Sequence, residues 1–367
     1  MKKFFYVAAA FLAAGFVSCD NNEGPNAPTA DLVPIHFNVG SGRAVIEETR
    51  GTGAVGDITG GENIWRGEEL NVYMFEKGTL TPTADATGNG APLFYNDVVV
   101  APNADEATAM ATINTQKYYP MAGESDFFAY HADDAVAGAV VEGTDAFTLP
   151  VLIDGSQDLM VSKAALTAEQ EAMLPAEKAD KYYSAYSARK GVNPHFVFEH
   201  LLSRVTFEAK ANTAAETAVS INAIEITNAN TTADMVVAYV DAPAELLANQ
   251  ATPASVFLKE KAQGVAALQA LTATNPGLDY TRIGESLMLM PQAEYEMMIH
   301  MTQNIDGEDR NVSLPYTLKA ETLGLTAFEA GKQYNVKFTV YGLQEIVLEL
   351  ELVAWEEGGD IFVDDEN

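Results

Sequence analysis

The sequence is poor in cysteine, in tryptophan and in basic residues. Its 367 residues include one cysteine, two tryptophans and 21 lysines and arginines against 52 acidic residues, which gives a formal charge of −31. One cysteine cannot form an internal disulfide, so no disulfide framework holds this chain together. A strongly negative chain repels phosphate backbones, and we therefore expect no nucleic-acid partner. The apolar content of 48% is nevertheless that of a globular protein with a buried core.

Motifs for catalysis and for metal binding are also missing. The sequence contains no G-x-S-x-G motif and no P-loop. Only His195 and His200 lie close together among the five histidines, and a spacing of five places both imidazoles on one face of neither a helix nor a strand. We interpret the histidines as structural or solvated, and we expect no enzyme activity, no cofactor and no metal site.

Two acidic segments resemble calcium-binding loops without matching one. They are "DITGGEN" (57–63) and "NIDGEDRN" (304–311), and neither has the ligand spacing of an EF-hand. We interpret both as acidic turns, with adventitious calcium as the alternative.

The first nineteen residues have the pattern of a secretory leader. Lys2 and Lys3 precede an apolar run over 4–17, and the single cysteine, Cys19, follows closely. The run is too short for a membrane-spanning helix, which needs about 20 apolar residues. The leader therefore predicts export rather than a transmembrane anchor.

The end of the leader resembles a bacterial lipobox, "FVSC" (16–19). We predict a signal peptide at 1–18 and acylation of Cys19, which would attach the chain to the outer membrane by lipid. A free thiol at Cys19 is the alternative. Residues 19–31 are polar and predict a flexible tether, and their acidic residues resemble the surface-export signal of Bacteroidetes lipoproteins.

Most of the chain after the tether alternates apolar and polar residues at period two, which is the pattern of β-strands. The series begins at "LVPIHFNV" (32–39), here called the first strand. The apolar positions that share one face in later strands are Leu70, Val72 and Met74; Val205, Phe207 and Ala209; Tyr295, Met297, Ile299 and Met301; Tyr334, Val336, Phe338 and Val340; and Ile346, Leu348, Leu350 and Leu352. Strands with one apolar and one polar face form the layers of a sandwich, so we predict an all-β fold.

Two segments break this alternation. Residues 164–190 and 253–273 are rich in alanine and charged or polar residues, and we predict short helical insertions there. A polar segment ending in glycine and proline, "ARKGVNPHFVFEH" (188–200), predicts a domain boundary. We therefore predict an N-terminal domain at 32–195 and a C-terminal domain at 196–367.

Aromatic residues concentrate in "KYYPMAGESDFFAYHADD" (117–134). They are Tyr118, Tyr119, Phe127, Phe128 and Tyr130. Tyrosines near turns could form a platform on which a carbohydrate stacks. Aromatic side chains in strands belong more often to the core, and we favour that interpretation.

The segment after the first strand, "GSGRAVIEETRGTG" (40–53), contains two of the three basic residues between positions 4 and 76. Arg43 and Arg50 lie there among glycines and threonines, which predict an accessible loop. An arginine in such a loop is either a protease site or a partner for a nearby acid, Glu47 or Glu48. Sequence alone leaves both alternatives open.

The order of these features resembles the Bacteroidetes fimbrillins, the type V pilins. The segments that carry the resemblance are the lipobox at Cys19, the arginines after the first strand, "IWRGEELNVYMF" (64–75), "KYYPMAGESDFFAYHADD" (117–134), "FVFEHLLSRVTFEA" (196–209), "ESLMLMPQ" (285–292) and "VAWEEGGDIFV" (353–363). The resemblance implies two tandem transthyretin-like β-sandwich domains and no catalysis. It also implies a structural subunit of cell-surface fimbriae that serve adhesion and biofilm formation.

The resemblance further implies how such subunits assemble. An arginine-specific surface protease cuts after the first strand, and a strand from a neighbouring fimbrial subunit fills the groove that is left. Arg43–Ala44 is the favoured bond here and Arg50–Gly51 the alternative. The groove positions would be those of Ile35, Phe37 and Val39.

Candidate donor residues lie at the other end of the chain. They are Ile346, Leu348, Leu350 and Leu352, with the tail after Trp355 as a further candidate. An intramolecular C-terminal strand is the alternative role for the leucine-rich part. The alternative function is a surface-anchored lipoprotein that binds a glycan or a host protein without polymerising. Whether the subunit would be a stalk, tip or anchor stays open.

Overall fold

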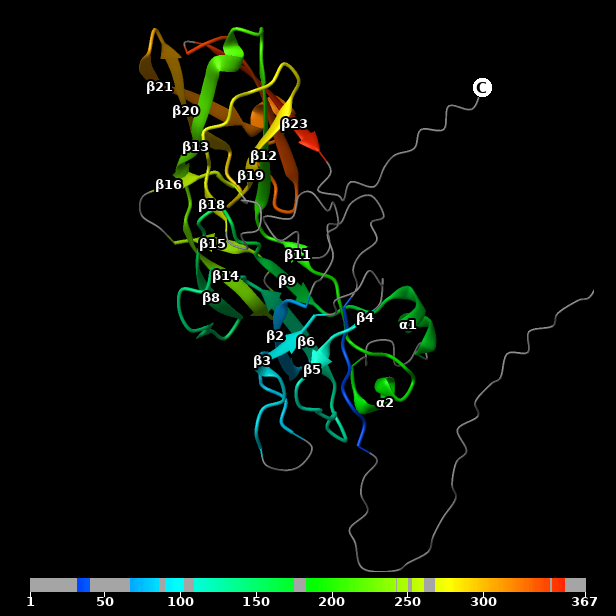
Figure 1. Cartoon of the computed structure of the whole chain (residues 1–367). Helices are drawn as coiled ribbons and strands as arrows, with labels where there is room; N and C mark the ends of the chain where they lie inside the picture. Colours follow the sequence, from blue (N-terminus) through cyan, green and yellow to red (C-terminus); the bar gives the residue numbers. More distant parts are fainter. Residues whose placement is uncertain are drawn as a thin grey trace, which may run out of the picture. The chain divides into compact units, whose positions relative to one another are not determined.

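A computed structural model describes residues 32–39, 67–85, 90–101, 109–174, 183–241, 243–249, 253–260, 268–343 and 345–353. The chain divides into two units, Met1–Leu32 and Val33–Asn367, and every element below belongs to the second. Strands dominate these residues, which confirms the all-β class (Figure 1). The helices of the described part are all too short or too polar to cross a lipid bilayer.

The largest sheet has six strands in the order β11-β9-β6-β2-β3-β5. Its strands are β2 (Glu69–Glu76), β3 (Tyr95–Val100), β5 (Thr112–Ile113), β6 (Ser125–His131), β9 (Met160–Lys163) and β11 (Glu199–His200). Strand β2 is buried on both faces. Its predicted face, Leu70, Val72 and Met74, is confirmed and packs into one hydrophobic cluster, the N-terminal core, whereas Tyr73 and Phe75 pack into another, the middle core.

A small sheet of order β10-β1-β4 contributes to the N-terminal core. It consists of β1 (Asn38–Val39), β4 (Ala109–Met110) and β10 (His195–Phe196). β1 is the end of the first strand and lies between the other two. It runs antiparallel to β4 and parallel to β10.

The middle core is completed by a sheet of order β15-β14-β8-β7. Its strands are β7 (Val141–Glu142), β8 (Ala146–Leu152), β14 (Thr232–Tyr239) and β15 (Leu246–Ala248). β14 pairs with β8 over seven registered positions, from Thr232↔Leu152 to Tyr239↔Ala146. This sheet therefore joins strands from both sides of residue 195, where the sequence predicts a boundary.

Two four-stranded sheets, β19-β12-β22-β23 and β16-β13-β20-β21, enclose a third cluster, the C-terminal core. Their strands are β12 (Ser203–Ala211), β13 (Val219–Ala229), β16 (Ala254–Phe257), β19 (Thr281–Leu289), β20 (Glu294–Ile305), β21 (Glu308–Lys319), β22 (Gln333–Val340) and β23 (Ile346–Val353). The predicted faces of β12, β20 and β22 are all buried in this core and are confirmed.

The first predicted helical insertion is confirmed and the second is wrong. Within 164–190 lie α1 (Ala168–Met173) and α2 (Ala185–Ala188), each started by a capping box. Two short 3₁₀ helices, η3 (Glu216–Ala218) and η4 (Ala320–Leu323), lie elsewhere.

The described part of 253–273 contains strands instead of a helix: β16, β17 (Lys259–Glu260) and β18 (Gln269–Ala270). Val256 and Leu258 are buried at alternate positions, while Phe257 between them is half exposed. The backbones approach closely here, since a Cβ added at Gly284 would lie 2.8 Å from the Lys259 carbonyl oxygen. Packing against β13 and β19 thus overrides the helical composition of this segment.

Candidate functional site

The first strand is held by backbone hydrogen bonds to the segment that contains β4 and Tyr119. The Ile35 amide donates to the Lys117 carbonyl at 2.9 Å, and the Val33 carbonyl accepts from the Tyr119 amide at 2.9 Å. The Phe37 carbonyl accepts from the Ala111 amide at 3.1 Å. Beyond Phe37 the strand gains its second neighbour, β10. Among the described residues it thus has one backbone neighbour over residues 33–37 and two at Asn38–Val39.

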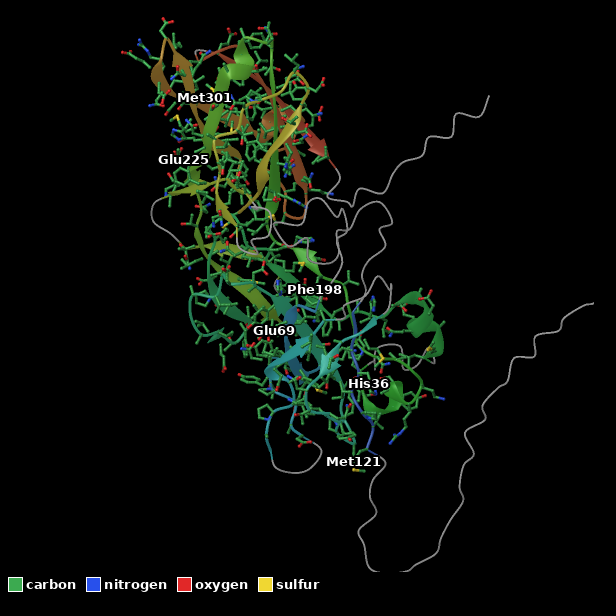
Figure 2. The ribbon with its side chains drawn as sticks, viewed as in Figure 1. His36, Glu69, Met121, Phe198, Glu225 and Met301 are labelled. Atoms are coloured by element: carbon green, nitrogen blue, oxygen red, sulfur yellow. The ribbon has the colours of Figure 1, made fainter. Side chains whose placement is uncertain are left out.

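Side chains of the first strand alternate between the core and the surface. Val33 is 8% exposed, and Ile35 and Phe37 are fully buried in the N-terminal core. Pro34 and His36 point the other way and are partly exposed; Figure 2 labels His36. Burying three such apolar side chains stabilises a fold by about 1.5–3 kcal/mol each. The first strand is therefore a structural part of the core.

Phe37 is the centre of an aromatic cluster. Its ring centroid lies 4.9 Å from that of Phe94, 5.5 Å from that of Phe127 and 5.4 Å from that of Phe196. The Phe94 and Phe127 rings meet it edge-on, at interplanar angles of 71° and 72°. Edge-to-face contacts of this kind add to the stabilisation from burial.

Among the predicted groove residues, the structure brings Ile35 and Phe37 together in one core. The backbone of Val39 pairs with Phe196 and Ala109, and its side chain lies outside the described residues. The residues that concern the predicted acylation and cleavage lie outside the described part: Cys19, Arg43, Ala44, Glu47, Glu48, Arg50 and Gly51. Acylation and cleavage therefore stay predictions.

The predicted donor residues form an intramolecular edge strand, β23. Among the described residues it pairs with β22 alone, and Leu348 and Leu350 lie opposite the buried Phe338 and Val336. Burial decreases along the strand. Ile346 is 5% exposed, Leu348 and Leu350 are half-buried, and Leu352 is 47% exposed. The other edge of β23 has no ladder partner among the described residues.

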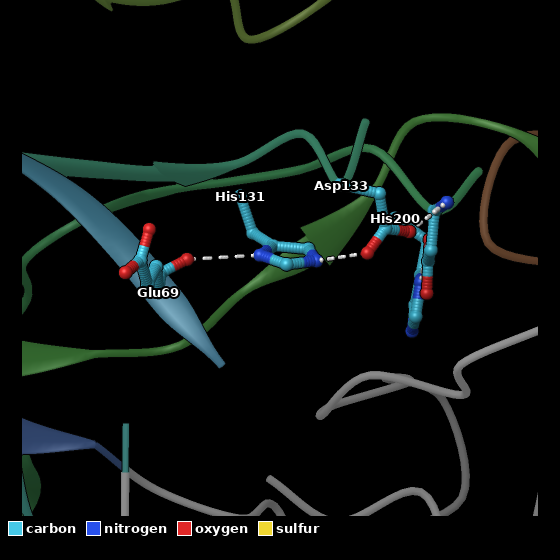
Figure 3. Close-up of polar contacts among 5 residues, drawn as sticks. Glu69, His131, Asp133 and His200 are labelled. Carbon is cyan, nitrogen blue, oxygen red and sulfur yellow. Dashed lines mark hydrogen bonds and ion pairs between the residues drawn. The ribbon is translucent and has the colours of Figure 1, made fainter. Parts of the chain in front are cut away.

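Two histidine–aspartate pairs lie beside the six-stranded sheet (Figure 3). His131 Nδ1 lies 3.0 Å from the Glu69 carbonyl oxygen, and Nε2 lies 2.7 Å from Asp133 Oδ1. His200 Nδ1 lies 2.8 Å from Asp158 Oδ1, and both side chains are fully buried. The Asp158 amide donates to Asp133 Oδ2 at 2.7 Å, which links the two pairs.

His131 faces an acceptor at each ring nitrogen, so its charged form can donate at both. Burial by itself lowers the pKa of this imidazole, but the hydrogen bond and charge of Asp133, the Glu69 carbonyl and the charge of Asp158 outweigh burial and raise the pKa to about 9. The interpretation of the histidines as structural is consistent with this geometry. The His131-x-Asp133 spacing could have revealed one pair, but 42 residues separate the members of the other.

The structure also describes the predicted aromatic cluster and one of the two acidic segments. Tyr119, Phe127, Phe128 and Tyr130 are all at most 3% exposed, which confirms the core interpretation for these four, whereas Tyr118 is only partly buried. In "NIDGEDRN", Asn304 Nδ2 donates to Asp309 Oδ1 at 2.7 Å within the β20–β21 turn, whereas "DITGGEN" lies outside the described residues. No group of three His, Cys, Asp or Glu residues in the described part could hold a metal ion.

A pocket of about 580 Å³ opens beside the segment that pairs with the start of the first strand. Its lining includes the polar residues Glu76, Thr83, Glu124 and Ser125 and the apolar residues Ala84, Pro120 and Ala122. Thr83 Oγ1 and Ser125 Oγ lie 3.4 Å apart. The pocket therefore offers hydroxyl and carboxylate groups beside apolar side chains.

The model of one protein family, described as fimbrillin-like, matches residues 49–355. The chain belongs to the fimbrillin-like family. A search of curated proteins finds no match.

Similar solved structures are reported as cell-adhesion or fimbrial proteins. A putative cell adhesion protein from Bacteroides uniformis has a TM-score of 0.50 and 18% identity, and the similarity covers 88% of this fimbrillin-like chain and 99% of that one. A putative cell adhesion protein from Bacteroides ovatus has a TM-score of 0.48 and 14% identity, with coverage of 88% and 97%. The fimbrial anchor protein Mfa2 from Porphyromonas gingivalis has a TM-score of 0.37 and 12% identity, with coverage of 88% and 99%.

Proposed function

We propose that this chain is a structural subunit of cell-surface fimbriae that serves adhesion and biofilm formation. It is exported as a lipoprotein acylated at Cys19, which places it on the outer membrane. An arginine-specific protease cuts it after Arg43, or alternatively after Arg50. A strand from another subunit then replaces the first strand, and the subunits polymerise head to tail.

The placement of the first strand supports this proposal most directly. Its inward side chains, Val33, Ile35 and Phe37, are buried in the N-terminal core, and its backbone bonds to the segment containing Tyr119. Losing this strand would leave unpaired backbone groups and an apolar trough, a state that soluble proteins avoid. A strand from outside would satisfy the same hydrogen bonds and fill the same space. Membership of the fimbrillin-like family supports the same function.

The proposed division into two domains has support from the separate N-terminal and C-terminal cores, but Phe196 and Phe198, which follow residue 195, pack into the N-terminal core. The middle core and the β14–β8 pairing would then join the two domains. A connection through paired strands suits a subunit that transmits tension along a fibre.

The test is cleavage of the purified precursor by an arginine-specific protease. We expect a new N-terminus at Ala44 or Gly51 and a ladder of oligomers after the cut. The substitutions Arg43→Lys and Arg50→Lys keep the charge but remove the cleavage site, so each single variant identifies the bond and the double variant stays monomeric. Arg310→Lys is the matched control, because Arg310 is exposed with 62% of its side chain accessible and lies far along the chain. A cut chain that remains monomeric would contradict the proposal.

The pocket near Glu76 and Glu124, whose lining combines carboxylates with apolar side chains, favours a second candidate, an adhesin that binds a glycan without polymerising. An array of glycans probed with the uncut lipoprotein tests it. Binding that is lost in Glu124→Gln, with no oligomers after cleavage, would favour the adhesin over the fimbrial subunit.

A further inference from the structure

The position of Phe37 differs chemically from the other inward positions of the first strand. Phe37 is the only ring among the three inward side chains, and it lies among the rings of Phe94, Phe127 and Phe196. These rings come from three separate parts of the chain: the segment before β3, strand β6 and strand β10. They form a ring pocket, defined by Phe94, Phe127 and Phe196, at one end of the groove.

Backbone hydrogen bonds alone do not fix the register of a strand in this groove. The first strand runs antiparallel to both ends of the segment 109–119, with Asn38 opposite Met110 and Pro34 opposite Tyr118. Along the first strand, the backbone groups that bond this segment belong to Val33, Ile35 and Phe37 and thus recur every two residues. A slip by two residues therefore remakes the hydrogen bonds. A slip by one residue would turn the apolar face of the strand to solvent. The alternation of apolar and polar side chains therefore already excludes it.

Side chains must then exclude the two-residue slips. Such a slip would place Ile35, or the residue at position 39, in the ring pocket. It would also move the Phe37 ring to a site that Ile35 fills, or out of the groove. An aliphatic side chain loses the edge-to-face contacts, and a displaced ring overpacks its new site.

We propose that the ring pocket fixes the register of the strand that fills the groove and selects an aromatic side chain at that position. For a strand from another subunit this inference rests on the proposed function. The partner that fits is a strand with two aliphatic side chains and one aromatic side chain at alternate positions, as in Val33, Ile35 and Phe37. The set Ile346, Leu348, Leu350 and Leu352 carries no ring, so this part of β23 does not fit the pocket.

The first experiment uses the uncut full-length chain and does not depend on polymerisation. In the exchange variant Ile35→Phe/Phe37→Ile, composition and total side-chain volume are unchanged, and only the position of the ring moves. We expect the ratio of folded to unfolded chain, from chemical denaturation, to fall at least a hundredfold. Ile35→Leu is the control for a changed side-chain shape at the neighbouring position, and a fall of less than about tenfold is expected. An exchange variant as stable as the parent chain would overturn the proposal.

The second experiment tests selection in trans. The full chain is cut after the first strand, and fluorescent peptides compete with the bound N-terminal segment, followed by anisotropy. We expect the peptide of residues 32–39 to bind. The same peptide with Ile35 and Phe37 exchanged should bind at least tenfold more weakly, and the peptide of residues 346–353 should not compete. Equal binding of all three peptides would overturn ring selection.

The two experiments separate failure of the inference from failure of the proposed function. If no peptide binds although the exchange variant is destabilised, the groove does not accept a strand in trans, and the proposed polymerisation fails while the register function stands for the chain's own strand. If the peptide of residues 346–353 binds as well as that of 32–39, the ring pocket is not selective.

Discussion

The first strand and the last described strand, β23, share an alternating pattern of apolar residues but have very different surroundings. Both alternate apolar side chains at period two. The first strand buries its inward side chains fully or nearly so, and β1 at its end lies between β10 and β4. In the described part of the chain β23 has one ladder neighbour, and its inward side chains change from the buried Ile346 to the half-exposed Leu352.

This difference shows that alternation tells which side chains face the core but not how much each one contributes. The contribution depends on neighbouring strands and on the layer above. A strand that is cut away must leave an otherwise complete core if a second strand is to take its place. The first strand meets this condition because the rings around Phe37 come from elements that remain.

The largest expected effect is the loss of the Phe37 ring. Phe37→Ala should lower the free energy of unfolding by about 3–5 kcal/mol, since it leaves a cavity among three rings. Leu352→Ala in β23 should cost less than about 1 kcal/mol, because that side chain is already half exposed. Chemical denaturation of both variants measures the contrast. Similar losses in the two strands would remove the basis of the comparison.

Sequence patterns predict much of this fold for a simple physical reason. The strand period is two, so the buried faces of β2, β12, β20 and β22 can be read directly from apolar positions. The helix predicted at 253–273 is wrong because the prediction rests on the composition of the segment, whereas Val256 and Leu258 alternate as buried residues of a strand do. The partner strands of the first strand could not be predicted, because pairing between distant segments leaves no local signal.

The candidate site was predictable to a similar degree. Alternation identifies Ile35 and Phe37 as inward, but the ring pocket needs three phenylalanines from positions 94, 127 and 196, which only the fold brings together. The buried His200–Asp158 pair is also invisible in the sequence, because its members come from distant segments.

Alkaline pH should destabilise the part of the fold that contains the first strand. His131 bonds the carbonyl of Glu69 in β2, and its pKa is raised from 6.5 to about 9 in the folded chain. The proton is therefore bound more tightly by the folded chain, so its stabilisation is complete below pH of about 6.5 and is lost as pH rises through about 9. Unfolding measured between pH 6 and pH 10 should show a loss of about 2–3 kcal/mol. In His131→Gln this difference should shrink, and an unchanged pH dependence would contradict the assignment.

A gradient of smaller effects is expected within β23 itself. Ile346→Ala should cost about 2–3 kcal/mol and Leu350→Ala about 1–2 kcal/mol, because exposure rises along the strand. Chemical denaturation of each single alanine variant measures the series. A flat series would contradict the dependence of these losses on exposure and would make β23 resemble the first strand.

The smallest effect should come from the charged face of β23. Lys337 Nζ lies 2.6 Å from Glu351 Oε2, and the hydrogen bond to Glu351 raises the pKa of Lys337. Because 44% of the Glu351 side chain is exposed, water and salt screen the pair, so Glu351→Gln should cost no more than about 0.5 kcal/mol and nothing at high salt. Denaturation at low and high ionic strength measures this cost. A loss comparable to that of Ile346→Ala would mean that β23 is held at its surface rather than by its core face, and the gradient of burial would no longer explain how the strand is fixed.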